Sequence, residues 1–289
     1  MFDFLKYKKR YLLISSMVIL AGLFSVLKWG FNYSIDFVGG TNLEYQLDKN
    51  VNKSNIETVF KNNKVDIESL SVANNVLSVR TKAIDETKEN KIRTEIEKDL
   101  KTKVTVLRSE TVGPTLGKET LIKTLYASLF AVLGILLYIA FSFKSFNFAV
   151  AAIIALLHDL FVLVGSYSLL SHFFGAQLDT LFVTAVLTTM SFSVHDTIII
   201  FDKVREYRSS EGIANIEHSV NKALTETLVR SLNNSMTIIF MLLALTLLGG
   251  STIRFFVAAL LIGTFTGAYS SPFVAAPVLV WLEKMRKRK

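Results

Sequence analysis

Six long apolar stretches constrain this chain more than any other feature of its sequence. They lie at about 11–29, 122–142, 148–170, 178–201, 230–249 and 254–282. Each has roughly the 20 mostly apolar residues that an α-helix needs to cross ~30 Å of hydrocarbon. The last stretch is longer than one span requires, so we expect it to tilt, to kink at Pro272 or Pro277, or to end early. The sequence therefore predicts an α-helical polytopic membrane protein with six transmembrane helices.

The first stretch is expected to stay in place as an uncleaved anchor. It is long enough to span, and no A-x-A-like cleavage site follows it. The chain contains no cysteine, which excludes disulfides and thiolate metal sites.

The net charge of +8 is concentrated beside the apolar stretches. Residues 31–121 carry 14 basic and 14 acidic residues, whereas the rest of the chain carries 18 basic and 10 acidic residues. Membrane topology accounts for this distribution, which does not indicate a nucleic-acid surface. Basic residues precede the first span, follow the sixth, and lie in the loops after the second and fourth. The positive-inside rule therefore places both termini, including the basic C-terminal tail, in the cytoplasm and residues 30–121 outside.

Residues 30–121 are expected to form an extracytoplasmic α+β domain. Apolar residues alternate from Ile35 to Leu47, as in a strand, with an interruption at Gly39-Gly40. Further helix and strand patterns follow at 54–62, 65–72, 75–81, 85–100 and near 104–106. The order βαββαβ predicts a small ferredoxin-like sandwich. No catalytic constellation stands out in it, so we interpret it as a binding or lever module.

Segment 202–229, between the fourth and fifth spans, has its own pattern. Basic residues are followed by apolar residues at helical spacing. This pattern predicts an amphipathic helix that lies on the cytoplasmic membrane surface.

Ionisable residues inside spans are functional candidates, because each costs at least ~2.5 kcal/mol on insertion. The third span contains His158-Asp159, the fourth contains His195-Asp196, and the fifth begins with Arg230. We therefore expect these three spans to form a polar centre, with the first, second and sixth as its frame.

Two polar stripes share the helical spacing i, i+4 and i+7. They are Thr189, Ser193 and Asp196 in the fourth span, and Arg230, Asn234 and Thr237 in the fifth. Both lie toward the cytoplasmic side, so Asp196 is predicted to pair with Arg230. The pair would offset part of the burial cost, and protonation of Asp196 would break it. An alternative stays open, in which the pair only fixes the register of the helices.

Zinc binding by the two His-Asp dyads is disfavoured. Adjacent residues on a helix point about 100° apart, so one dyad cannot direct both side chains at one ion.

Small residues in the sixth span indicate close packing against another helix, and a helix of a partner subunit is one candidate for that contact. They are Gly263, Gly267, Ala268, Ser270 and Ser271.

Six short motifs lie in order along the predicted topology. They are Asp36-Phe37-Val38-Gly39-Gly40-Thr41, Val112-Gly113-Pro114-Thr115-Leu116-Gly117, Ala155-Leu156-Leu157-His158-Asp159, the run from Ser193 to Glu206, Arg230-Ser231-Leu232 with Ser235, and the glycines at 249, 250, 263 and 267 with Ser270-Ser271. Together they resemble the motifs of the SecF family of protein-export membrane subunits, within the RND superfamily. The resemblance runs nearly end to end.

The resemblance implies a function and partners. A SecF-type subunit is not an enzyme and needs no cofactor. With SecD, and beside the SecYEG translocon, it uses the proton motive force to promote late translocation of a preprotein. Its location is the bacterial cytoplasmic membrane, in contact with lipid. One RND-type repeat has six spans, so SecD would supply the second half of the assembly.

The resemblance also implies roles for residues. It makes Asp196 and Arg230 the proton-coupling pair, and Asp159 and His195 are further titratable candidates beside them. Thr189, Ser193, Asn234 and Thr237 are expected to support the pair. Gly39, Gly40, Gly113, Gly117 and Pro114 would shape a stiff joint between membrane and outer domain. Asp36, Phe37 and Thr41 are further structural motif residues beside them.

The sequence departs from the family pattern at a few positions. His195 stands where Asn is usual, Asn234 stands where Thr is usual, and Ser191-Phe192 replace Gly-Tyr. His195 either joins the proton path or packs as a neutral polar residue. Three other functions stay open at this point: half of a small-molecule RND exporter, a structural scaffold of the translocon, and an intramembrane enzyme that uses metal.

Overall fold

The structure is a computed structural model that describes residues 3–49, 51–73, 75–143, 145–210 and 215–288. The chain divides into two compact units. One comprises residues 33–126, and the other combines 1–32 with 127–289. We call the first the outer unit, after its predicted side of the membrane, and the second the membrane unit, because it contains most of the expected spans.

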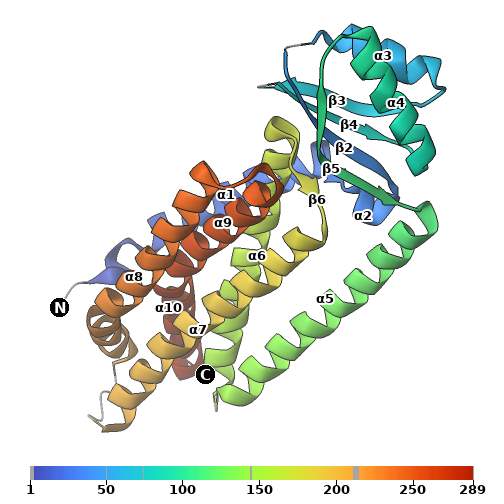
Figure 1. The fold of residues 1–289 in the computed structure, drawn as a ribbon. Coiled ribbons are helices and arrows are strands. Elements are labelled where there is room, and N and C mark those ends of the chain that lie inside the picture. The colour runs from blue at the N-terminus through green and yellow to red at the C-terminus, as the bar shows by residue number, and fades with distance from the viewer. Residues whose placement is uncertain (1–2, 50, 74, 144, 211–214, 289) are drawn as a thin grey trace. The chain divides into compact units, whose positions relative to one another are not determined.

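The described residues contain six helical segments that are long and apolar enough to cross a membrane. They are built from α1 (Lys8–Lys28, after a 3-10 turn at Phe4–Tyr7), α5 (Pro114–Ser142), α6 (Phe146–Phe174), α7 (Thr180–Ser210), α8 (Ile216–Leu248), and α9 (Arg254–Ser270) continued by α10 (Ala276–Arg288) (Figure 1). The prediction of six transmembrane helices is confirmed.

Three of these segments form the buried centre of the membrane unit. In the most apolar 18-residue stretch of each, 61% of α6, 44% of α7 and 56% of the α9–α10 segment is buried, against 17% in α1, 6% in α5 and 11% in α8. The sixth span therefore belongs to the centre, and its expected place in the frame is wrong. The fifth span, α8, is peripheral.

A π-helical turn at Ser271–Ala275 separates α9 from α10. Pro272 has no backbone N–H to donate, and the Ala276 N–H bonds to the Ser271 carbonyl, one residue further than in an α-helix. The interruption expected in the sixth stretch thus occurs at Pro272, while Pro277 lies within α10.

Helices α1 and α6 touch backbone to backbone. A Cβ added at Gly165 would lie 2.5 Å from the Gly22 Cα, closer than two atoms can approach. Ser25 and Ser168, about one turn further along, share a hydrogen bond of 2.8 Å between their hydroxyls. Small residues thus allow the first span to pack against the centre.

The expected surface helix over 202–229 is not a separate element. Its start is the end of α7 and most of its length is the start of α8, while residues 211–214 lie outside the described residues. The apolar face of the segment packs into the main core of the bundle, through Val204, Tyr207, Ile216, Val220 and Leu224. The amphipathic pattern is real, but this face is covered by protein.

The outer unit contains β2 (Gly40–Leu47), α3 (Lys53–Asn62), β3 (Ile67–Ala73), β4 (Val76–Thr81), α4 (Glu86–Asp99) and β5 (Val104–Val112). The strands form one antiparallel sheet in the order β3-β4-β2-β5, and α3 and α4 lie on one of its faces (Figure 1). The core between sheet and helices includes Leu43, Tyr45, Ile56, Phe60, Leu77, Ile92 and Ile96. The predicted βαββαβ order and ferredoxin-like sandwich are confirmed.

The beginning of the predicted first strand is instead a short helix, α2 (Ile35–Val38). The Ser34 side chain caps it by accepting the Asp36 N–H, and Gly39 ends it with a positive φ of 78°. Two-residue strands β1 (Asn32–Tyr33) and β6 (Gln177–Leu178) and a 3-10 turn at Ser251–Ile253 complete the described elements.

Candidate functional site

A buried polar cluster lies at the centre of the membrane unit, around Asp159 of α6. This side chain is 5% exposed, and its carboxylate accepts hydrogen bonds from the hydroxyls of Ser193 on α7 and Ser270 on α9, the latter at 2.6 Å. The adjacent His158 Nδ1 lies 2.8 Å from the other carboxylate oxygen. The Asp159 carboxylate therefore connects α6, α7 and α9 by hydrogen bonds to side chains of this chain.

A second hydrogen bond extends this cluster toward the π-helical turn. Thr197 of α7 and Ser271 share a hydrogen bond of 2.9 Å between their hydroxyls, and both side chains are buried. The π turn is thus in polar contact with α7. In a regular α-helix, a proline at this place would leave one backbone hydrogen bond unmade.

A second carboxylate, that of Asp196, lies on another side of α7 and faces α8. It is 8% exposed and accepts hydrogen bonds from Ser231 at 3.1 Å and from Ser235 at 3.5 Å. Ser231 and Ser235 are one turn apart on α8, so both hydroxyls point at the same place. The two acids are thus held by serines on different helices.

The predicted ion pair between Asp196 and Arg230 is absent among the described residues. Arg230 is exposed on the surface of α8, and its neighbour Ser231 takes the position that faces Asp196. Consecutive residues of a helix are rotated by about 100° about its axis, so Ser231 can face Asp196 while Arg230 lies beside the contact.

The rest of the expected α8 stripe follows Arg230 away from the contact. Thr237 is exposed and donates its hydroxyl to the Asn233 carbonyl of its own helix. Asn234 is exposed too, although it borders the small cavity described next. Ser231 and Ser235 belong to one of the six sequence motifs but had no predicted role, although their i, i+4 spacing places both on one face of the helix.

A small cavity lies beside Asp196, between α7, α8 and α9. His195, Asn234, Ser235 and Thr264 are among the residues that border it. The space open to the centre of a water molecule is about 20 Å³, which is enough for about one water. His195 is exposed at the edge of the cavity, next to Asp196 but outside the Asp159 cluster.

The small residues of α9 bring it against the polar stripe of α7. A Cβ at Gly263 would collide with the Thr189 side chain, and one at Gly267 would lie 3.1 Å from the Ser193 Cβ. Thr189 itself is buried and donates to the Val186 carbonyl. The close packing expected from these residues therefore occurs within the chain, and it seals the polar stripe on one side.

The two His-Asp dyads do not converge on one point. In the part of the chain that the structure describes, no three His, Asp or Glu side chains gather as a metal would need.

The glycine motifs of the outer unit form one tight joint. A Cβ at Gly39 would lie 2.7 Å from the Pro114 Cα, and one at Gly117 would lie 2.7 Å from the Gly39 nitrogen. The first turn of α5 thus rests directly on the backbone after α2. Thr41 is fully buried beside this joint and bonds the Thr111 hydroxyl at 2.9 Å.

The other motif residues lie around the same joint. Phe37 is buried, and Gly40 has a positive φ of 131°. Asp36 occupies the first turn of α2, and Gly113 has open space around it. The glycines and Pro114 that were predicted to shape a joint are therefore brought together, whereas their role in function stays a prediction.

Comparison with known families decides the classification. Residues 92–285 match the family described as "Protein export membrane protein SecD/SecF, C-terminal", and residues 25–51 match the "SecD/SecF GG Motif". The chain belongs to the SecD/SecF family of protein-export membrane proteins. This assignment separates it from RND-type exporters of small molecules, which was one of the alternatives.

Curated proteins match this SecD/SecF family member over nearly its whole length. It is 39% identical to the protein translocase subunit SecF of Thermobaculum terrenum, over 98% of this chain and 95% of the relative. It is 32% identical to the protein translocase subunit SecDF of Bacillus subtilis, over 99% of this chain but 39% of that longer protein.

A solved structure gives the same result. The crystal structure of SecDF from Thermus thermophilus, titled a translocon-associated membrane protein, matches with a TM-score of 0.86 and 30% identity. The match covers 98% of this chain and 39% of the SecDF chain. With its six spans, this SecD/SecF family member is a multi-pass cell-membrane protein.

Proposed function

We propose that this chain is the SecF-type subunit of the Sec protein-export machinery, and that Asp196 couples proton movement to late preprotein translocation. The relatives named SecF match it nearly end to end. In the SecDF relatives a chain like this one makes up only part of a longer protein. We therefore propose SecD as the partner that supplies the other part, next to SecYEG and the moving preprotein.

The environment of Asp196 is the observation that carries the coupling role. A carboxylate in a membrane span is costly when charged, and this one has serine hydroxyls as its hydrogen-bond partners and no cation in contact among the described residues. A protonated carboxyl can keep these contacts, because its carbonyl oxygen still accepts from the serine hydroxyls. A charged carboxylate would attract a cation, and Arg230, the residue before Ser231, is the cation that a rotation of α8 would bring toward it.

The proposed cycle alternates between these two partners. Protonated Asp196 keeps its serine contacts, and loss of the proton favours a rotation of α8 that brings Arg230 to the carboxylate. α8 is suited to this motion, because it is peripheral in the bundle and only 11% of its most apolar stretch is buried. The Asp159 cluster, tied to three helices, would serve as the fixed part against which α8 turns.

We propose that motion reaches the outer domain through α5. This helix begins at Pro114 against Gly39, where the contact of backbone on backbone leaves little room for independent movement. In this proposal residues 30–121 face outward and both termini are cytoplasmic, as the basic loops favour.

Gradient-driven export in vesicles that lack ATP tests the coupling role. We expect Asp196→Asn to abolish the stimulation of preprotein movement by an imposed pH gradient. Asp202→Asn is the matched control, since Asp202 lies on the same helix, is exposed, and bonds only to Arg205 among the described ion pairs. A parallel arm with a sodium gradient identifies the ion. If Asp196→Asn and Arg230→Met both kept full stimulation, the chain would be a structural scaffold instead.

A further inference from the structure

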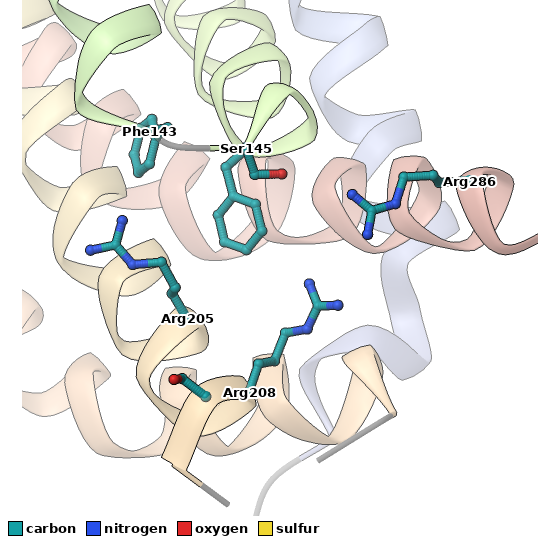
Figure 2. Close-up of a pocket in the computed structure, with 7 residues that line it drawn as sticks. Phe143, Ser145, Arg205, Arg208 and Arg286 are labelled. Carbon is teal, nitrogen blue, oxygen red and sulfur yellow. The ribbon is translucent and has the colours of Figure 1, made fainter. Parts of the chain in front are cut away.

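A cavity of about 370 Å³ opens at one end of the membrane unit, outside the proposed coupling site. It is bordered by the ends of α5, α6, α7 and α10, through Phe143, Ser145, Phe148, Arg205, Arg208 and Arg286. Figure 2 shows the guanidinium groups of Arg205 and Arg208, from α7, and of Arg286, from α10, around one space with Phe143 and Ser145 on its other side. The three arginines thus converge from two helices that are far apart in sequence.

The charge around the cavity is positive on balance. Arg208 pairs at 2.9 Å with Glu283, which is 1% exposed, and Arg286 lies 3.9 Å from the same carboxylate. Arg205 pairs with the exposed Asp202 at 3.1 Å. Three guanidinium groups therefore face two carboxylates, and Glu283 also accepts a hydrogen bond of 2.6 Å from the neutral amide of Asn147.

The N-terminus of α6 adds to the positive potential of the cavity. Ser145 is the N-cap residue, but its side chain makes no capping hydrogen bond. The first backbone N–H groups of α6 therefore have no side-chain acceptor from the cap, and the helix dipole favours an anion there. This agrees with the arginines and is independent of them.

The surroundings of the cavity are those of a membrane interface. Phe141 is 84% exposed and Phe146 is 82% exposed, and each is close in sequence to a residue that borders the cavity. Both lie at the ends of predicted spans, where an exposed apolar ring meets the acyl chains next to the headgroup layer. A ligand with a phosphate and acyl chains would match arginines and aromatic residues together.

We propose that this cavity binds the phosphate headgroup of an anionic phospholipid from the cytoplasmic leaflet. Arg205 and Arg286 supply charge and fork-shaped donors that suit phosphate oxygens. Arg208 is held in place by buried Glu283, and the acyl chains lie along Phe141 and Phe146. The bound lipid joins the ends of four spans next to the end of α7, the helix that carries Asp196.

Native mass spectrometry of the purified full chain in detergent tests the proposal. Phosphatidylglycerol and phosphatidylcholine with identical acyl chains are titrated into wild type, Arg205→Gln/Arg286→Gln and a control. The control is Lys9→Gln/Arg10→Gln, which removes the same charge from the same side of the membrane, outside the cavity. Arg208 is left intact, because its loss would leave Glu283 buried without its closest cation. Unchanged thermal unfolding of the variants shows that they are folded.

We expect one phosphatidylglycerol to bind more tightly than phosphatidylcholine. The cavity variant should weaken that binding by about tenfold to thirtyfold, while the control retains it. Equal binding of the two lipids, or equal losses in both variants, would overturn the proposal. Arg205→Gln alone provides a milder variant, with a loss of several-fold expected.

Competition identifies the source of the anion. Inorganic phosphate and an acidic peptide are added at millimolar concentration to the complex with phosphatidylglycerol. Retention of the lipid supports a site that needs headgroup and acyl chains together. Full displacement by phosphate would make the cavity a site for soluble anions, and full displacement by the peptide would make it a docking site for a protein; either result contradicts the lipid assignment.

Discussion

The Asp196 carboxylate of α7 accepts a hydrogen bond of 3.1 Å from the Ser231 hydroxyl of α8, while Arg230, the preceding residue, is exposed. Two candidate partners of one acid are therefore neighbours on the same helix, and in the proposed cycle a rotation of that helix would exchange them. In this structure the neutral partner is engaged. A coupling acid needs such alternatives, because a proton changes which of them binds better.

Ser231→Ala tests whether the neutral partner matters for coupling. The variant removes the hydroxyl that stabilises the serine-bound arrangement, so we expect gradient-driven export to fall by about three- to tenfold, since a net hydrogen bond contributes ~0.5–1.5 kcal/mol. The measurement is the rate of preprotein movement in vesicles under an imposed pH gradient.

Thr237→Ala is the control for Ser231→Ala. Thr237 lies on the same helix, is exposed, and its hydroxyl donates only to the Asn233 carbonyl among the described bonds. We expect its rate to equal wild type. A loss in Thr237→Ala as large as in Ser231→Ala would favour the stripe that was predicted from the sequence over the one in the structure.

The sequence predicted the elements well because their signals are local. Apolar length alone identifies the six spans, and periodicity alone identifies the βαββαβ order of the insert. The contact between Asp196 and α8 is different, because it depends on how α8 is rotated about its axis. Spacing shows that Arg230 and Asn234 share a face, as do Ser231 and Ser235, but it does not show which face meets α7.

The segment 202–229 fails as a prediction for a related reason. An amphipathic pattern gives one apolar face, and lipid and protein are equally able to cover it. Here Val204 and Val220 are fully buried in the core of the bundle. The helix α2 was missed for another reason. It has four residues between the Ser34 cap and Gly39, which are too few to show a helical period.

Asp159→Asn is expected to affect stability through three helices at once. It keeps the size of the side chain but weakens its acceptance of hydroxyls from Ser193 and Ser270. Hydrogen bonds between membrane helices average about 0.6 kcal/mol and reach ~1.7 kcal/mol, so we expect a loss of roughly 1–2 kcal/mol in unfolding free energy. Reversible unfolding of the chain in mixed micelles measures it. Asp202→Asn, at an exposed carboxylate, should leave the free energy unchanged, and equal losses would mean that the Asp159 cluster is not a fixed part.

Gly39→Ala tests the joint between α2 and α5. Gly39 has φ 78° and ψ 171°, a region essentially limited to glycine that costs about 1–3 kcal/mol for other residues. The added methyl would also lie 2.7 Å from the Pro114 Cα. We expect a less stable outer domain, seen as faster proteolysis of residues 33–126 in the intact chain, and lower export. Gly113→Ala is matched to it, because a Cβ there meets nothing within 4 Å. Proteolysis that is accelerated equally in both variants would contradict the role of the tight contact.

Tyr45 gives the outer domain a dependence on alkaline pH. Its side chain is fully buried and donates its hydroxyl to Glu89 at 3.1 Å, and burial, reinforced by the Glu89 charge, raises the pKa of the Tyr45 phenol well above its usual value. The unfolded chain releases this proton near pH ~10, while the folded chain still holds it. The contribution to stability is therefore complete below pH ~10 and is lost as the pH rises beyond that.

Pulse proteolysis of the full chain in urea, from pH 7 to pH 11, measures the effect of Tyr45. We expect the midpoint for residues 33–126 to fall above pH ~10 in wild type and to fall less steeply in Tyr45→Phe, which has no proton to lose at this position. At pH 7 the variant should be about 1 kcal/mol less stable, because the bond to Glu89 is gone. Tyr33→Phe, at a tyrosine that is 45% exposed, should follow the wild-type curve. Parallel curves for wild type and Tyr45→Phe would show that the alkaline loss comes from other groups.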